Sequence, residues 1–218
     1  MIFILSLALV PVFVLIVFMY RKDSVHPEPI HMIIKGLIYG VISCFVSLMI
    51  TSLQESGADD FADAFIGAAL PEEFAKLLML WLLVRKSEYF DEPVDAIVYS
   101  VCVTLGFAGF ENVMYLMDGG DVLSLGIMRG LFSVPGHFCF GVCMGYFYAL
   151  AHFGKHWNMV YRFAAYFVPV LLHGLYDGLL SLSDDDTALI VIPIWIVFCI
   201  FMYKKALKRI EKTKENVA

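Results

Sequence analysis

Long apolar stretches that contain no charged residue constrain this chain more than any other feature of its sequence. Of its 218 residues, 61% are hydrophobic and only 17% are charged, and the mean hydropathy is +0.80. An ordinary soluble domain is about 45–50% apolar, whereas a helix that crosses a bilayer needs about 20 apolar residues in a row. The sequence therefore excludes a water-soluble globule and predicts an all-α polytopic membrane protein.

Seven apolar runs are long enough to cross a bilayer as helices. Their predicted bounds are residues 2–20, 31–53, 61–84, 94–117, 124–151, 160–182 and 187–203. Because seven spans use nearly the whole chain, we expect one integral-membrane helical domain over residues 1–203 and a basic cytoplasmic tail over residues 204–218. The lipid bilayer is then an obligatory partner. The net charge of −6 argues against binding to nucleic acid.

The distribution of lysine and arginine predicts the orientation of the chain. Twelve of the 15 follow the first, third and seventh apolar runs or flank the connection between the fifth and the sixth. The connections after the second, fourth and sixth runs contain none, and carry instead Glu55, Asp59, Asp60, Asp118, Asp121 and Asp184 to Asp186. By the positive-inside rule, we expect the N-terminus outside and the C-terminus in the cytoplasm.

Several ionisable residues lie inside the apolar runs, where each costs about 2.5–3.5 kcal/mol on insertion scales. Lys35 and Arg129 lie where their side chains are expected to snorkel toward headgroups. The others are Glu72, Glu73, Lys76, Glu111, His137, His173 and Asp177. A helical rise of about 1.5 Å per residue places the carboxylates and imidazoles in the outer half of the membrane, on four different helices. Function is the default explanation for such a set.

These residue types permit three kinds of chemistry. A glutamate in a low-dielectric pocket is a general base for water, and nearby histidines then stabilise an oxyanion or protonate a leaving amine. The same groups can bind a divalent metal such as zinc, although no His-Glu-x-x-His motif is present. Intramembrane carboxylates and histidines also build proton-coupled transporters, but the chain shows no internal repeat. Hydrolysis is the favoured interpretation.

Four sequence blocks resemble those of the PrsW family of bacterial membrane proteases. They are residues 71–76 (PEEFAK), 107–115 (FAGFENVMY), 135–137 (PGH) and 173–177 (HGLYD), and they occur in order across the predicted spans. The wider group includes CAAX-prenyl endopeptidases and bacteriocin-processing immunity proteins. The resemblance implies a multi-pass protease of the bacterial cell membrane, which makes the first (site-1) extracytoplasmic cut in a membrane-anchored anti-sigma factor during a stress response.

The resemblance also implies roles for individual residues. The catalytic candidates are Glu72, Glu73, Glu111, His137, His173 and Asp177, with Lys76 and Asn112 in support. Glu72 is the implied water-activating base, and Glu73 is its partner, held by Lys76. Prenyl endopeptidases have a histidine where this chain has Glu111, so the role of that residue stays open.

A mechanism based on glutamate and water, with no cofactor, is the expectation. A zinc-dependent enzyme is the alternative, with Glu72, Glu73, His137 and His173 as ligands. A CAAX-type endopeptidase and a proton-coupled transporter are the further alternatives.

Overall fold

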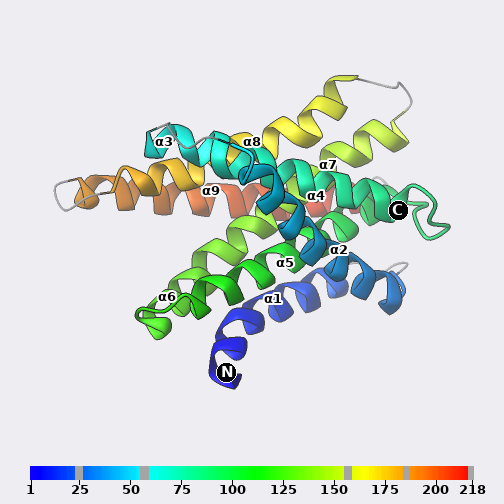
Figure 1. The fold of residues 1–218 in the computed structure, drawn as a ribbon. Coiled ribbons are helices and arrows are strands. Elements are labelled where there is room, and N and C mark those ends of the chain that lie inside the picture. The colour runs from blue at the N-terminus through cyan, green and yellow to red at the C-terminus, as the bar shows by residue number, and fades with distance from the viewer. Residues whose placement is uncertain (23–26, 55–58, 155–158, 184–186, 216–218) are drawn as a thin grey trace.

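The computed structural model describes residues 1–22, 27–54, 59–154, 159–183 and 187–215, which form α- and π-helices joined by turns and loops (Figure 1). These residues form seven rods. Five rods are single helices: α1 (Ile2–Lys22), α2 (Ile30–Thr51), α5 (Pro93–Met117), α8 (Met159–Ser181) and α9 (Ala188–Glu215). The third rod joins α3 (Asp60–Asp63), the π-helix η1 (Ala64–Ala69) and α4 (Leu70–Val84). The fifth joins α6 (Val122–Met128), the π-helix η2 (Arg129–Ser133) and α7 (Val134–Phe153).

The rods confirm the prediction of an all-α polytopic membrane protein. Within the described residues, six rods are long and apolar enough to cross a membrane. The third rod is the exception, because every stretch of 18 residues within it contains Glu72, Glu73 and Lys76. The rod that departs from the hydropathy of a membrane span is therefore the one that carries the first of the four sequence blocks.

Helix α5 lies at the centre of the bundle (Figure 1). Every residue from 94 to 109 is buried, and the helix packs against α7, α2, α1 and α4. Its crossing with α2 requires glycine on both helices. A Cβ atom on Gly40 would lie 2.1 Å from the carbonyl oxygen of Val103, and one on Gly106 would lie 2.2 Å from that of Leu37. The two backbones therefore touch directly at this crossing.

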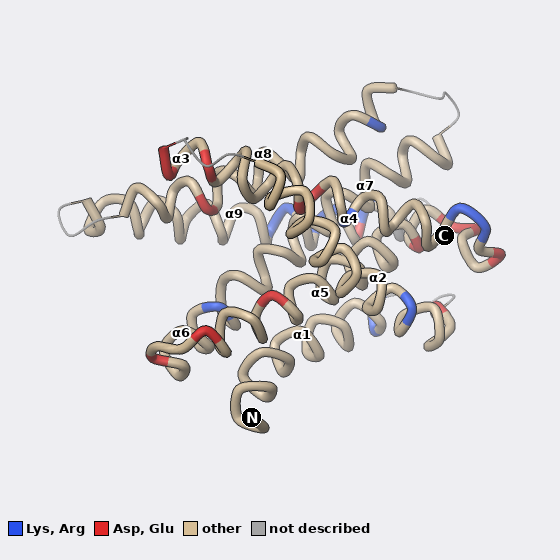
Figure 2. Tube along the Cα trace, in the orientation of Figure 1, with Lys and Arg blue, Asp and Glu red and all other residues tan. Residues whose placement is uncertain are grey.

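The two ends of the bundle differ in charge. At the end where α2, α5 and α8 finish, here called the acidic end, Asp and Glu lie along α3 and beside α6, while Lys and Arg gather mainly toward the opposite end, which holds the C-terminus (Figure 2). The predicted orientation was based on the same separation of charge in the sequence, and the orientation stays a prediction. Glu55, Lys155 and Asp184 to Asp186, which contributed to it, lie outside the described residues.

Helix α9 continues without a break past residue 203, where the sequence predicted the end of the membrane domain. Met202, Ala206 and Ile210 are buried in the core cluster that also contains residues of α5 and α7. The guanidinium of Arg209 lies 4.2 Å from the ring centroid of Tyr146. The described part of the basic segment is thus a helical extension that packs against the bundle.

Candidate active site

Two of the candidate blocks begin in the same way, with a π-helical segment followed by a proline. In the third rod η1 precedes Pro71, and in the fifth η2 precedes Pro135. Proline has no N–H to donate to the residue four positions earlier, so Pro71 cannot bond to the carbonyl of Gly67, which accepts from the hydroxyl of Thr51 at 3.2 Å. Single π turns inside helices are frequent at functional sites. Here they set the positions of the residues that follow each proline.

Lys76 lies at the centre of the candidate site and is fully buried. Its Nζ donates to Glu72 Oε2 at 3.1 Å, to Glu73 Oε1 at 2.9 Å and to His137 Nδ1 at 3.3 Å. The ring of Phe107 covers it at 3.9 Å from the centroid. A buried charge of this kind needs partners on every side, so one lysine fixes the positions of both glutamates and of one imidazole.

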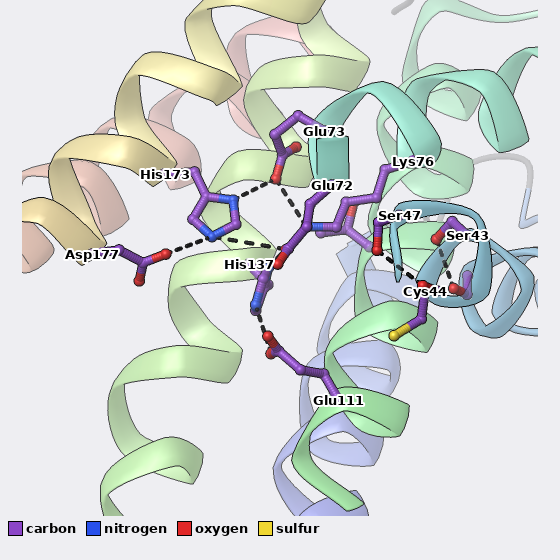
Figure 3. A network of polar contacts seen from close by, with 12 residues as sticks. Ser43, Cys44, Ser47, Glu72, Glu73, Lys76, Glu111, His137, His173 and Asp177 are labelled. Atoms are coloured by element: carbon purple, nitrogen blue, oxygen red, sulfur yellow. Dashed lines mark hydrogen bonds and ion pairs between the residues drawn. The ribbon is translucent and has the colours of Figure 1, made fainter. Parts of the chain in front are cut away.

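His173 lies between carboxylates on both sides of its ring (Figure 3). Nδ1 is 2.9 Å from Glu73 Oε1, while Nε2 is 3.0 Å from Asp177 Oδ2 and 3.9 Å from Glu72 Oε2. The ring stacks on that of Phe140, with centroids 4.8 Å apart. The predicted pairing of His173 with Asp177 across one helical turn is present.

The contacts of His137 fix the position of its proton. Because the ammonium of Lys76 can only donate, His137 Nδ1 accepts from it. The proton of a neutral ring then lies on Nε2, which donates to Glu111 Oε2 at 3.2 Å. Glu111 therefore contacts and orients His137, while its role in catalysis stays a prediction.

Arg129 belongs to the site, although the sequence analysis assigned it a snorkelling role. Its Nη2 donates to Glu111 Oε2 at 2.6 Å and its Nε donates to Asn112 Oδ1 at 2.7 Å. The guanidinium also lies 3.9 Å from the ring centroid of Tyr115. An arginine inside an apolar run is as costly as Lys76 in the same setting, and that cost was the signal that could have identified it.

A cavity of about 310 Å³ adjoins this network. It is lined by Glu72, Glu111, Arg129, His137, His173 and Asp177 among others, and it extends to Leu125 and Leu180 near the acidic end. Glu73, in contrast, is fully buried, and its Oε2 has no hydrogen-bond partner among the described residues. Glu72 is thus the glutamate of the pair that meets open space, as a water-activating group must.

The donor atoms also form a set that could hold a metal ion. One atom each from Glu72, His137 and His173 lie within 4.8 Å of one another. The four carboxylates of Glu72, Glu73, Glu111 and Asp177 exceed the two cations, Lys76 and Arg129, by two negative charges when both histidines are neutral. A divalent ion would balance this excess, so both the donor chemistry and the charge fit one.

All eight residues that the sequence singled out come together here. Six of them form one network of direct contacts, namely Glu72, Glu73, Lys76, His137, His173 and Asp177. Glu111 joins this network through His137, and Asn112 joins it through Arg129. They come from the third rod, α5, α7 and α8, so residues more than 100 positions apart in the sequence meet within one cluster. Their roles in catalysis stay a prediction.

Comparison with known proteins places the chain among membrane proteases. Residues 28–203 match the family described as PrsW family intramembrane metalloprotease. The chain is 37% identical to "Protease PrsW" of Geobacillus kaustophilus over 83% of this chain and 80% of that protein. It is 34% identical to the protein of that name from Oceanobacillus iheyensis over 99% and 98% of the two chains, and 31% identical to that of Bacillus subtilis over 97% and 95%. No solved structure matches the chain.

Proposed function

Because the chain belongs to the PrsW family of intramembrane proteases, we propose that it makes the first, extracytoplasmic cut in a membrane-anchored anti-sigma factor. The protein is a multi-pass membrane hydrolase of bacterial type. The cluster of Glu72, His137 and His173 beside a cavity that extends to the acidic end carries the proposal. The positive-inside rule predicts that this end faces outward, so water and an extracytoplasmic substrate segment would reach the site from there.

In this proposal Glu72 accepts a proton from the attacking water. One of its oxygens, Oε2, accepts a hydrogen bond from the Lys76 ammonium, so the other oxygen, Oε1, is left for the water. Glu73 does not line the cavity. It positions Lys76 and His173, because it accepts a hydrogen bond from each. His173, oriented by Asp177 and Glu73, stabilises charge on the carbonyl oxygen and returns a proton to the leaving amine.

The family's description as metalloproteases favours the metal-dependent alternative over the cofactor-free mechanism. Glu72, His137 and His173 would hold the ion, with zinc as the ion that two imidazoles and a carboxylate suit best. A divalent ion held there would supply Lewis-acid chemistry, for the activation of water and the polarisation of the scissile carbonyl. Glu73, which contacts His173 Nδ1, occupies the position in which a metal-binding histidine is usually supported. Glu111 contacts His137 in the same way, but His137 Nδ1 would have to give up its contact with Lys76 to bind the ion.

Metal analysis separates the two mechanisms. Purified protein is expected to contain about one equivalent of zinc, and His173→Ala is expected to lose it. The matched control is His152→Ala, a histidine near the other end of α7 that lies outside the cluster. Full activity in a strong chelator, together with protein free of metal, would overturn the metal assignment and leave the mechanism based on glutamate and water.

Reconstitution tests the proposed cut. The protein in liposomes, mixed with a membrane-anchored anti-sigma factor from the same organism, is expected to give a fragment whose new terminus lies in the extracytoplasmic part of the substrate, as mass spectrometry would show. A cut on the cytoplasmic side that requires a prenyl group would instead support the CAAX-type alternative. Absence of any cut, with folded protein in the same vesicles, would contradict the choice of substrate.

A further inference from the structure

A second cavity meets the site from the opposite side. It has a volume of about 350 Å³ and lies between α2 and α5, so it is called the α2–α5 cavity here. Its walls include Cys44, Ser47 and Leu48 from α2. Figure 3 shows Glu72 between His173 and Asp177 on one side and Cys44 and Ser47 on the other.

Three residues line both cavities, namely Glu72, Glu111 and Tyr115. A peptide bond held at Glu72 therefore has one cavity on each side. An extended chain advances about 3.3 Å per residue and turns successive side chains to opposite faces. Side chains on the two flanks of the scissile bond would thus occupy different cavities, and the walls of each cavity would select what it receives.

Building on the proposed proteolytic function, we propose that the α2–α5 cavity is a substrate subsite, which accepts an apolar or small neutral side chain next to the scissile bond and rejects an acidic one. Its apolar walls are Leu48, Phe107 and Met114. Burial of an apolar side chain against such walls contributes about 25 cal/mol per Å².

The charges that line the cavity account for the rejection. Three carboxylates, those of Glu72, Glu111 and Asp118, belong to its walls, and no lysine or arginine is among the described residues that line it. The hydroxyl of Ser47 already donates to the carbonyl of Cys44 at 2.9 Å. An acidic side chain would therefore meet like charges and lose water. The cavity on the other flank differs, because Arg129 lines it.

A charge reversal in the wall tests the subsite. The probe is the anti-sigma factor that the wild-type protein cuts, with each residue from three before to three after the cut changed singly to Leu, Asp or Lys. At one of these positions, Asp is expected to slow cleavage by the wild type at least about tenfold relative to Leu. Leu48→Arg is expected to remove most of that penalty and to slow cleavage of the Lys substrate.

Met49→Arg is the matched control, since Met49 adjoins Leu48 on α2, is exposed, and does not line the cavity. Asp118→Lys provides a second variant at the mouth of the cavity, in case Leu48→Arg does not fold. A wild-type protein that cuts none of the substrates would count against the proposed function. A wild type that cuts all Asp substrates equally well, or Leu48→Arg and Met49→Arg variants with the same preferences, would overturn the subsite alone.

Discussion

At the scale of single residues, the cost of burying charge in lipid was the most informative signal in the sequence. It identified Glu72, Lys76 and His173 before any contact was known, because an uncompensated ionisable group is rarely kept inside an apolar run. It did not reveal which groups pair. The same argument applied to Arg129 would have placed that residue in the site, but its position near the end of a predicted span favoured the simpler snorkelling interpretation.

The first residue-scale prediction concerns the two adjacent glutamates. In the mechanism based on glutamate and water, Glu72→Gln should reduce kcat by about 10²–10⁴-fold, the usual loss for a general base, while the protein stays folded because the amide is nearly isosteric. Glu88→Gln is the control, since Glu88 is exposed and lies outside the cluster. Cleavage rates would be measured with the reconstituted substrate. A folded Glu72→Gln variant with normal kcat would remove Glu72 from the mechanism.

The second residue-scale prediction concerns His173, in the fourth sequence block. His173→Ala should abolish cleavage, because the imidazole contacts three carboxylates and faces the cavity. In the mechanism based on glutamate and water, Asp177→Asn should retain part of the activity, with a loss of about tenfold, because asparagine still accepts a hydrogen bond from Nε2. Single-turnover rates of the two variants would show the difference. Equal and complete loss in both would mean that the charge of Asp177, and not its orienting contact, is required.

At the scale of helices and their packing, the apolar runs predicted the bounds of the rods to within a few residues, except that α9 continues well past the predicted end of its apolar run. Residues 204–215 continue α9 because Met202, Ala206 and Ile210 recur every four positions and bury one face of the helix. The π turns η1 and η2 had no sequence signal apart from the prolines that follow them. They lie directly before the segments that carry Glu72 and His137, and no local pattern records how these two side chains are aimed.

The crossing of α2 and α5 gives a prediction at this scale. Gly40→Ala should lower the free energy of unfolding by roughly 1–3 kcal/mol, the range for overpacked sites. The reason is that the new Cβ would lie within 2.7 Å of backbone atoms of Val103 and Phe107. The control is Gly109→Ala, whose Cβ would meet only side-chain methyls, at 3.3 Å or more. Unfolding in detergent micelles would be compared for the two variants. Equal stability would mean that the helices can separate at little cost.

At the scale of the whole molecule, the separation of charge between the two ends predicts how the protein lies in the membrane. In a variant without native cysteines, Gln54→Cys should react with an impermeant maleimide added to intact cells, because Gln54 follows α2 at the acidic end. Lys86→Cys, which follows α4 at the other end, should react only after permeabilisation. The reverse pattern would invert the orientation and place the proposed cut on the cytoplasmic side.

The charges of the third rod have a consequence for the order in which the protein is made. Glu72, Glu73 and Lys76 together cost roughly 8–10 kcal/mol in lipid on insertion scales, and Glu73 leaves the ribosome 100 residues before its partner His173. The rod therefore cannot settle in the bilayer on its own, and its insertion must wait for α7 and α8. Nascent chains that end before residue 122 should leave Lys76→Cys open to aqueous labelling, and protection should appear only once residue 181 has been synthesised. Biogenesis and the catalytic cluster thus depend on the same contacts, so a variant that loses His173 risks a slower passage from the ribosome into the membrane.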